Sequence, residues 1–93
     1  MIDQEQRAAK WYRDEFGTDI VDVGTEYAKL GEEYGEVGKA LIQGKKKDTF
    51  LEVGDCLVCL AHILRSECPG NKLEGAMSAA LDKCERRLRE GKR

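Results

Sequence analysis

Four acidic residues, placed in two pairs with the same spacing, are the part of this sequence best suited to chemistry. Glu33 and Glu36 are three residues apart, and so are Glu52 and Asp55. In a helix this spacing puts the two carboxylates of a pair about one turn apart. Carboxylates gathered at a partly buried edge repel one another, and a hard cation such as Mg²⁺ relieves that repulsion. The two pairs therefore predict a magnesium site formed by neighbouring helices.

A fifth acid, Glu32, is distinguished from the others by helix geometry. With Leu30 at the centre of the apolar stripe, Glu33 lies about 60° and Glu36 about 120° to the same side, at about 100° per residue. Glu32 points roughly away from the stripe, so it is a poorer metal ligand. Glu32 and Glu33 both remain candidates for a general base, because this placement of Glu32 assumes an ideal helix.

Basic and aromatic residues offer contacts for a ligand that carries phosphate. Lys83 and Arg87 are four residues apart, so they can reach one anion, and the planar Arg fork suits phosphate oxygens. Lys29 lies one turn before Glu33 and can reach the same region. Trp11 can stack on a base, although an aromatic residue on an amphipathic helix is more often part of the core. The alternative for Lys83 and Arg87 is pairing with nearby acids on the surface, and the alternative for the four carboxylates is an ordinary solvated helix face.

Helices are the elements that must position these side chains. The chain has 93 residues, one proline and no sustained alternation of β-branched residues, which predicts a single all-α domain over 1–93. The apolar spacing predicts four helices, over about 3–16, 25–44, 49–66 and 72–88. Beyond Cys56 the third helix is apolar nearly all round. This pattern predicts that a partner chain covers part of it, and therefore a homo-oligomer.

The second and fourth helices carry the clearest apolar stripes. We expect the second helix to bury Tyr27, Leu30, Tyr34, Val37 and Leu41. We expect the fourth helix to bury Leu73, Ala76, Met77, Ala80, Leu81, Cys84 and Leu88. Both stripes follow the three- and four-residue steps of a helix packed on one face, which is typical of a helical bundle.

Composition and charge exclude several classes of function. Basic residues are interspersed with acidic ones at a net charge of −2, which argues against a nucleic acid polymer as partner. No stretch approaches the roughly 20 apolar residues of a membrane span. The polar amino terminus lacks the apolar core of a secretory signal, so we expect a cytoplasmic protein under reducing conditions.

The cysteines and the one histidine lie mostly in apolar sequence. Cys56 and Cys59 form a CxxC inside the run CLVCLAHIL, which favours small core thiols over a metal or redox pair. We expect the same core role for Cys68 and Cys84. His62 lies in the same run, and we expect a core or interface position for it.

Two motifs resemble those of a known enzyme family. KLGEEYGEV, followed by FLEVGDCL, is similar to the EExxE and ExxD motifs of the MazG-like, all-alpha nucleoside triphosphate pyrophosphohydrolases, and Lys83 and Arg87 match a downstream KxxxR. The resemblance implies a four-helix MazG-like bundle that forms a homodimer or a tetramer of two dimers. It also implies Mg²⁺ as cofactor, bound by Glu33, Glu36, Glu52 and Asp55.

The same resemblance implies a reaction. Family members cleave a nucleoside triphosphate between the α and β phosphates, which yields a monophosphate and pyrophosphate. Removal of non-standard nucleotides is one role that such an activity serves. Two alternatives stay open at this stage: a helical interaction module that keeps the acids for solubility, and a nucleotide-binding protein without turnover.

Overall fold

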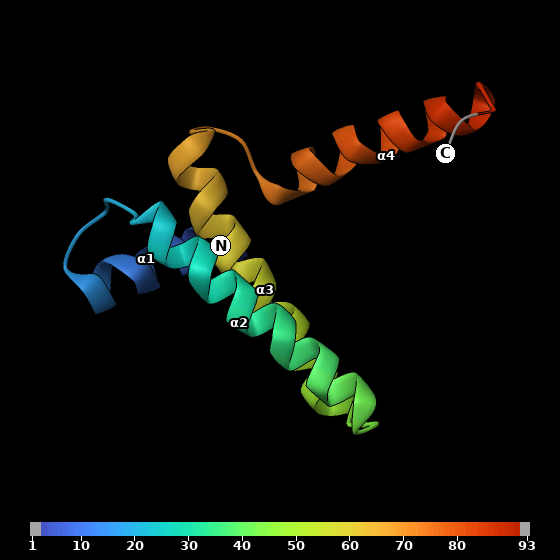
Figure 1. Cartoon of the computed structure of the whole chain (residues 1–93). Helices are drawn as coiled ribbons and strands as arrows, with labels where there is room; N and C mark the ends of the chain where they lie inside the picture. Colours follow the sequence, from blue (N-terminus) through green and yellow to red (C-terminus); the bar gives the residue numbers. More distant parts are fainter. Residues whose placement is uncertain (1–2, 92–93) are drawn as a thin grey trace.

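Four helices and their connections make up residues 3–91, the part of the chain that the computed structural model describes (Figure 1). They are α1 (Gln4–Phe16), α2 (Val23–Ile42), α3 (Lys46–Glu67) and α4 (Leu73–Arg89). No strand occurs among the described residues, so the prediction of an all-α chain with four helices is confirmed. None of these helices is long and apolar enough to cross a membrane.

Local signals set the ends of the first two helices. Asp3 caps α1: its side chain accepts from the Gln6 N–H, and the Gln6 side chain accepts from the Asp3 N–H. Gly17 ends α1 with a φ of 70°, a left-handed conformation that costs glycine little. α2 begins earlier than predicted, because the carboxylate of Asp22 caps it by accepting from the Thr25 N–H.

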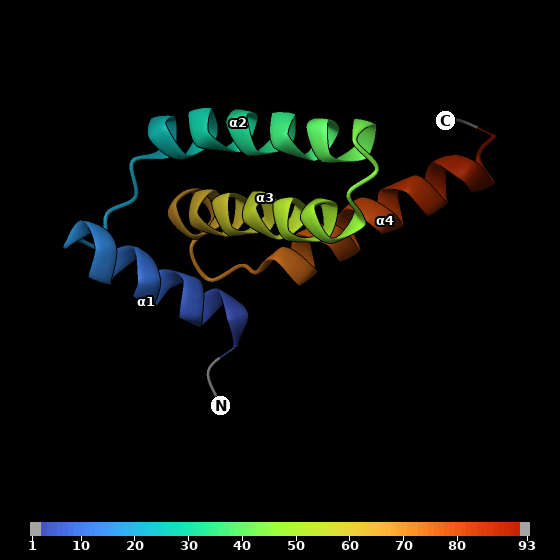
Figure 2. The same cartoon turned by 90° about the horizontal axis from the view of Figure 1, so that it is seen from below.

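α2 and α3 lie side by side as an antiparallel pair joined by a tight turn at Gly44, whose φ is 68° (Figures 1 and 2). One face of α2 is buried or half-buried at steps of three and four residues. Its members are Glu26, Leu30, Glu33, Val37 and Ala40. Because this face meets α3, the two glutamates on it are carried toward α3 as well.

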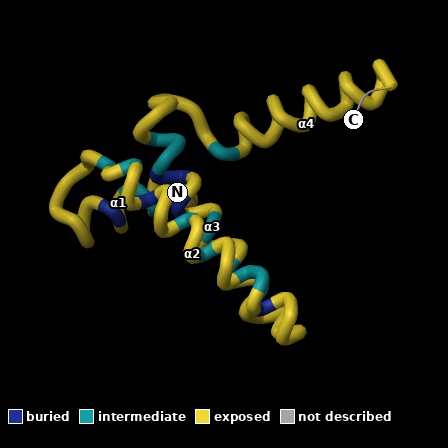
Figure 3. Tube along the Cα trace, in the orientation of Figure 1, coloured by how far each residue is buried: buried dark blue, intermediate teal, exposed yellow. Residues whose placement is uncertain are grey.

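α1 closes the end of the pair where α2 begins and α3 ends. Tyr12 of α1 is buried, and its hydroxyl oxygen accepts a hydrogen bond from the Asp22 N–H at 3.1 Å. The Tyr12 ring packs against Phe16 and His62, with ring centres 4.6 and 4.9 Å apart. Most of the buried residues gather at this three-helix junction (Figure 3). The core is therefore small and lies at one end of the α2–α3 pair.

α4 extends away from the other three helices (Figures 1 and 2). At the start of α4 the Leu73 N–H donates to the carboxylate of Glu5 in α1 at 3.0 Å, and α4 also contacts α3. No described residue of α4 is buried, and Met77, Leu81 and Leu88 are exposed. The prediction that this stripe is buried is wrong for a single chain.

The predicted stripe of α2 is largely exposed as well. Tyr27, Tyr34 and Leu41 follow one another at seven-residue steps and are 71%, 75% and 63% exposed. The radius of gyration is 15.5 Å, whereas a compact domain of this length has about 12 Å. The four helices of one chain therefore do not close into a compact bundle.

Candidate metal centre

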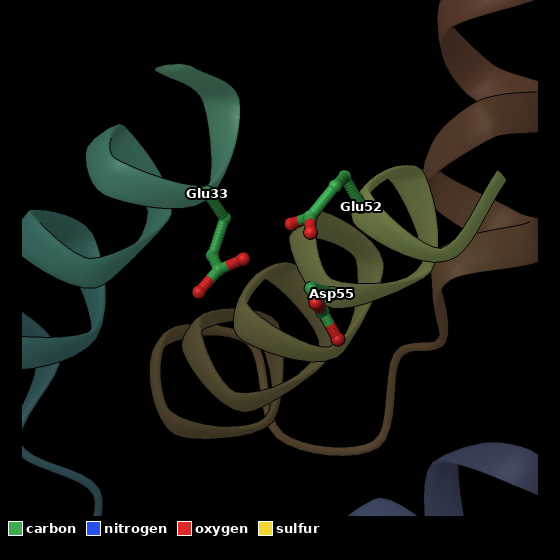
Figure 4. A group of neighbouring side chains, drawn as sticks. All are labelled: Glu33, Glu52 and Asp55. Carbon is green, nitrogen blue, oxygen red and sulfur yellow. The ribbon is translucent and has the colours of Figure 1, made fainter. Parts of the chain in front are cut away.

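Three carboxylates from α2 and α3 converge on one small region (Figure 4). Glu33 reaches across from α2, and Glu52 and Asp55 extend from successive turns of α3. Each contributes an oxygen, and the three oxygens lie within 4.8 Å of one another. Ligand oxygens on one Mg²⁺ are at most about 4.2 Å apart, twice a bond of about 2.1 Å. Small side-chain rotations would therefore bring all three onto one ion, so the residues fit a divalent cation.

The electrostatics of this group favour a positive partner. Burial, hydrogen bonding with Glu33 and the negative charges of Asp55, Glu33 and Glu36 raise the pKa of Glu52. Among residues 3–91, none of the ion pairs involves a member of the group. A bound cation would oppose these effects, because it favours the ionised carboxylates.

Two of the predicted acids lie outside the group. Glu36 is exposed and is not one of the three converging residues, although its charge acts on Glu52. Glu32 is exposed and also lies outside, in agreement with its angular position. Glu33 is therefore the candidate base that belongs to the carboxylate group.

A cavity of about 470 Å³ adjoins the carboxylates. Its wall is built from α1, α2 and α3 and includes Glu33 and Asp55 of the group, so the cavity and the candidate metal centre are continuous. This volume lies within the range of about 300–1,000 Å³ that is usual for small-molecule sites. The arrangement can hold an organic ligand with one end beside the carboxylates.

Trp11, the predicted aromatic contact, lines this cavity. Its side chain stays 45% exposed, and the ammonium nitrogen of Lys29 lies 5.8 Å from its ring centre. Lys29 and Arg7 both line the cavity and supply positive charge to it. Arg7 was missed from the sequence, although it precedes Trp11 by four residues and so shares its helix face.

Lys83 and Arg87 are not brought to this cavity within one chain. Both residues are exposed on α4, which contributes no described residue to the cavity or to the carboxylate group. The cations beside the cavity are instead Lys29 and Arg7. A phosphate contact from α4 would therefore require a second chain.

Two buried polar residues also line the cavity. Glu26, which sequence reasoning overlooked, is only 4% exposed, and His62, predicted as a core or interface residue, is 1% exposed. The signal for Glu26 was its position seven residues before Glu33, which places both on one helix face. Neither residue belongs to the converging carboxylate group.

The protonation of His62 follows from its neighbours. Burial, together with the positive charges of Arg65 and Lys29, lowers the pKa of His62 to about 4, so the ring is neutral at pH 7. The Arg65 guanidinium, which can only donate, bonds to His62 Nδ1 at 3.1 Å. The ring proton therefore sits on Nε2, which has no hydrogen-bond partner among residues 3–91.

The cysteines behave as thiols rather than as a reactive pair. All four are free, and burial raises the pKa of Cys59 to about 11 and also raises the pKa of Cys56. Both thiols therefore stay protonated, which disfavours redox or metal chemistry. Cys68 and Cys84 are exposed, so the prediction of a core position is wrong for these two.

Comparisons with family models, curated proteins and solved structures gave no match for this chain. The resemblance to the MazG-like family therefore rests on the motif residues themselves. It stays a prediction, as do the reaction and the assembly that it implies.

Proposed function

We propose that this chain is a Mg²⁺-dependent nucleoside triphosphate pyrophosphohydrolase that converts a (deoxy)nucleoside triphosphate into its monophosphate and pyrophosphate. The observation that carries the proposal is the convergence of Glu33, Glu52 and Asp55 beside a cavity large enough for a nucleoside. The resemblance of the EExxE and ExxD segments to the MazG-like family supports the same reaction. Removal of non-standard nucleotides is a role that suits it.

The carboxylates would bind the magnesium ion, and one of them would accept a proton from the attacking water. Glu33, Glu52 and Asp55 would be the central ligands, and the neighbouring Glu36 would complete the predicted set. When bound, Mg²⁺ supplies charge neutralisation for the triphosphate and lowers the pKa of a water molecule. Glu33 would accept a proton from the water that attacks the α-phosphorus, and pyrophosphate would leave with the electron pair of the broken α–β anhydride bond.

The cavity residues would hold the remainder of the substrate. Lys29 and Arg7 attract the phosphates through charge-assisted hydrogen bonds, and the exposed face of Trp11 stacks on the base. Lys83 and Arg87, which lie on α4, would act on phosphate only from a second chain.

We infer that the chain works as a homodimer or as a tetramer of two dimers. The supporting observation is the exposed apolar surface on α2, α3 and α4, including Tyr34, Phe50 and Met77. The accessible surface of 7459 Å² exceeds the roughly 5,400 Å² expected for a compact 10.5 kDa protein. The excess of about 2,000 Å² is of the size buried in obligate interfaces.

Pyrophosphate release from a panel of common and modified nucleoside triphosphates, with and without Mg²⁺, tests the enzymatic proposal. We expect monophosphate and pyrophosphate in equal amounts, and only when the cation is present. Absence of release from every nucleotide would contradict the proposal. Nucleotide binding without release would favour the binding alternative, and absence of both would favour an interaction module.

A further inference from the structure

Glu26 is a buried acid whose carboxylate has no hydrogen-bond or ion-pair partner among residues 3–91. The residue is only 4% exposed. It nevertheless lines the cavity beside the candidate metal centre. Burial of a carboxylate costs free energy unless hydrogen bonds replace those to water. The Glu26 carboxylate is therefore suited to accept hydrogen bonds from a ligand in the cavity.

His62 places a complementary group in the same cavity wall. Its neutral ring carries a proton on Nε2, because Nδ1 accepts from Arg65, and that Nε2–H lacks an acceptor among the described residues. The wall therefore holds one unsatisfied donor from α3 and, from α2, a carboxylate that accepts no hydrogen bond from residues 3–91. A ligand edge that satisfies both must carry an acceptor next to donors.

We propose that Glu26 is a specificity-determining residue that selects a guanine-type base, in an inference that rests on the proposed nucleotide hydrolysis. A carboxylate has two acceptor oxygens and no donor at neutral pH. Among the four common bases, guanine is the one whose pairing edge presents two adjacent donors, N1–H and N2–H₂, beside the acceptor O6. The Glu26 carboxylate accepts from both donors, and His62 Nε2–H faces O6.

The position of Glu26 relative to the carboxylate group agrees with this assignment. Glu26 and Glu33 lie on one face of α2 and are two turns apart, about 10 Å along the axis. That separation matches the span from the pairing edge of a base to its α-phosphate in an extended nucleotide. Trp11, half-exposed in the same cavity, offers a surface on which the base ring can stack.

Substrate preference in the presence of Mg²⁺ tests the role of Glu26. We expect wild-type protein to show its highest kcat/KM for dGTP, and about tenfold less for dITP, which lacks the 2-amino donor. Glu26→Gln, which replaces one acceptor oxygen by a donor, should lower kcat/KM for dGTP by about 10- to 100-fold and leave dATP nearly unchanged. Glu26→Asp keeps both acceptors and should keep the guanine preference. Glu15→Gln, at an exposed position of α1, is the matched control.

Other results would overturn the inference. Wild-type protein without a guanine preference would do so, as would a Glu26→Gln variant that loses activity equally toward all bases. An equal loss would assign Glu26 to stabilisation of the α2 amino terminus, where it lies in the first turn. Far-UV circular dichroism checks that each variant is folded.

A separate measurement distinguishes failure of the base assignment from failure of the enzymatic proposal. Trp11 is the one tryptophan of the chain, so its fluorescence reports ligands in the cavity without turnover. Suppose that no triphosphate is hydrolysed. Quenching of Trp11 fluorescence by GMP but not by AMP would then support the base assignment alone, provided that Glu26→Gln abolishes the quenching by GMP. Equal quenching by both, or quenching by neither, overturns it.

Discussion

Trp11 of α1 and His62 of α3 stack with ring centres 6.0 Å apart and planes inclined by 17°. The contact sets the position of the indole at the cavity wall while 45% of that side chain stays exposed. Since His62 is itself held by Arg65 and packed on Tyr12, the indole rests on a buried, ordered neighbour. A stacking surface of this kind is arranged before any ligand arrives.

Replacement of Trp11 should weaken substrate binding more than turnover. A base stacked on an aromatic side chain contributes about 1–3 kcal/mol, so Trp11→Ala should raise KM by about 5- to 150-fold. Trp11→Phe keeps a flat surface and should restore most of the affinity. Steady-state kinetics on the preferred triphosphate measure both constants, and an unchanged KM in the alanine variant would exclude stacking.

Neutralising the converging carboxylates should abolish turnover without unfolding the chain. Asp55→Asn and Glu33→Gln each remove a negative ligand while keeping side-chain volume, and we expect kcat/KM to fall at least about 100-fold. Glu32→Gln, an exposed change outside the group, should remain close to wild type if Glu33 is the base. Loss of activity in Glu32→Gln alone would transfer the role of base to Glu32. Loss of helicity in the first two variants would indicate a structural role.

Magnesium should stabilise the folded protein in a pH-dependent way. The raised pKa of Glu52 means that the folded state holds this proton more tightly than the unfolded state. The contribution of protonated Glu52 to folding stability is therefore present below its ordinary pKa of 4.5. This contribution is lost as the pH rises through the pKa of Glu52 in the folded state. We expect MgCl₂ to raise Tm near neutral pH and to have little effect near about pH 4, where protons replace the cation.

Thermal unfolding at two pH values checks this expectation about magnesium. NaCl at equal ionic strength controls for screening, and Asp55→Asn should lose most of the Tm shift. An equal shift at both pH values, or a shift that persists in Asp55→Asn, would show that the ion acts elsewhere.

His62 should make the folded protein less stable as the pH falls, whereas the contribution of Glu52 is lost as the pH rises. Its pKa falls from 6.5 in the unfolded chain to about 4 in the folded one, so the folded state disfavours the charged ring. The associated stability is fully present above 6.5 and is lost as the pH falls through 4, up to about 3 kcal/mol in total. Urea unfolding at a series of pH values measures this change. His62→Phe, which keeps a ring but cannot titrate, should flatten the acid limb, and an equally acid-sensitive variant would contradict the assignment.

Association should depend on the exposed stripe of α2. Tyr34→Glu places a charge in the middle of the row formed with Tyr27 and Leu41, and we expect it to shift the protein toward monomer. Tyr34→Phe keeps the surface apolar and should associate normally. Sedimentation velocity over a range of concentrations measures both, and a wild-type protein that stays monomeric at high concentration would refute the oligomer.

The sequence by itself determined the properties that depend on near neighbours in the chain. The helix ends at Asp3 and Gly17 follow from side-chain capping and from the positive φ that glycine tolerates. The one-turn spacing of Glu52 and Asp55 follows from helix geometry, whatever surrounds the helix. The outward position of Glu32 was predictable for the same reason.

Only the tertiary structure decided which helix faces meet. Hydrophobicity pointed to Tyr27 and Tyr34 as buried, yet α2 turns the face with Glu26 and Glu33 toward α3 and leaves the tyrosines exposed. The rotation of a helix about its axis is set by contacts with residues far away in the chain. An apolar stripe alone therefore cannot specify this rotation when two faces of the helix are both suited to burial. The same physical reason explains why Glu26, His62 and Trp11 share one cavity, and why the apolar stripe of α4 remains exposed in a single chain.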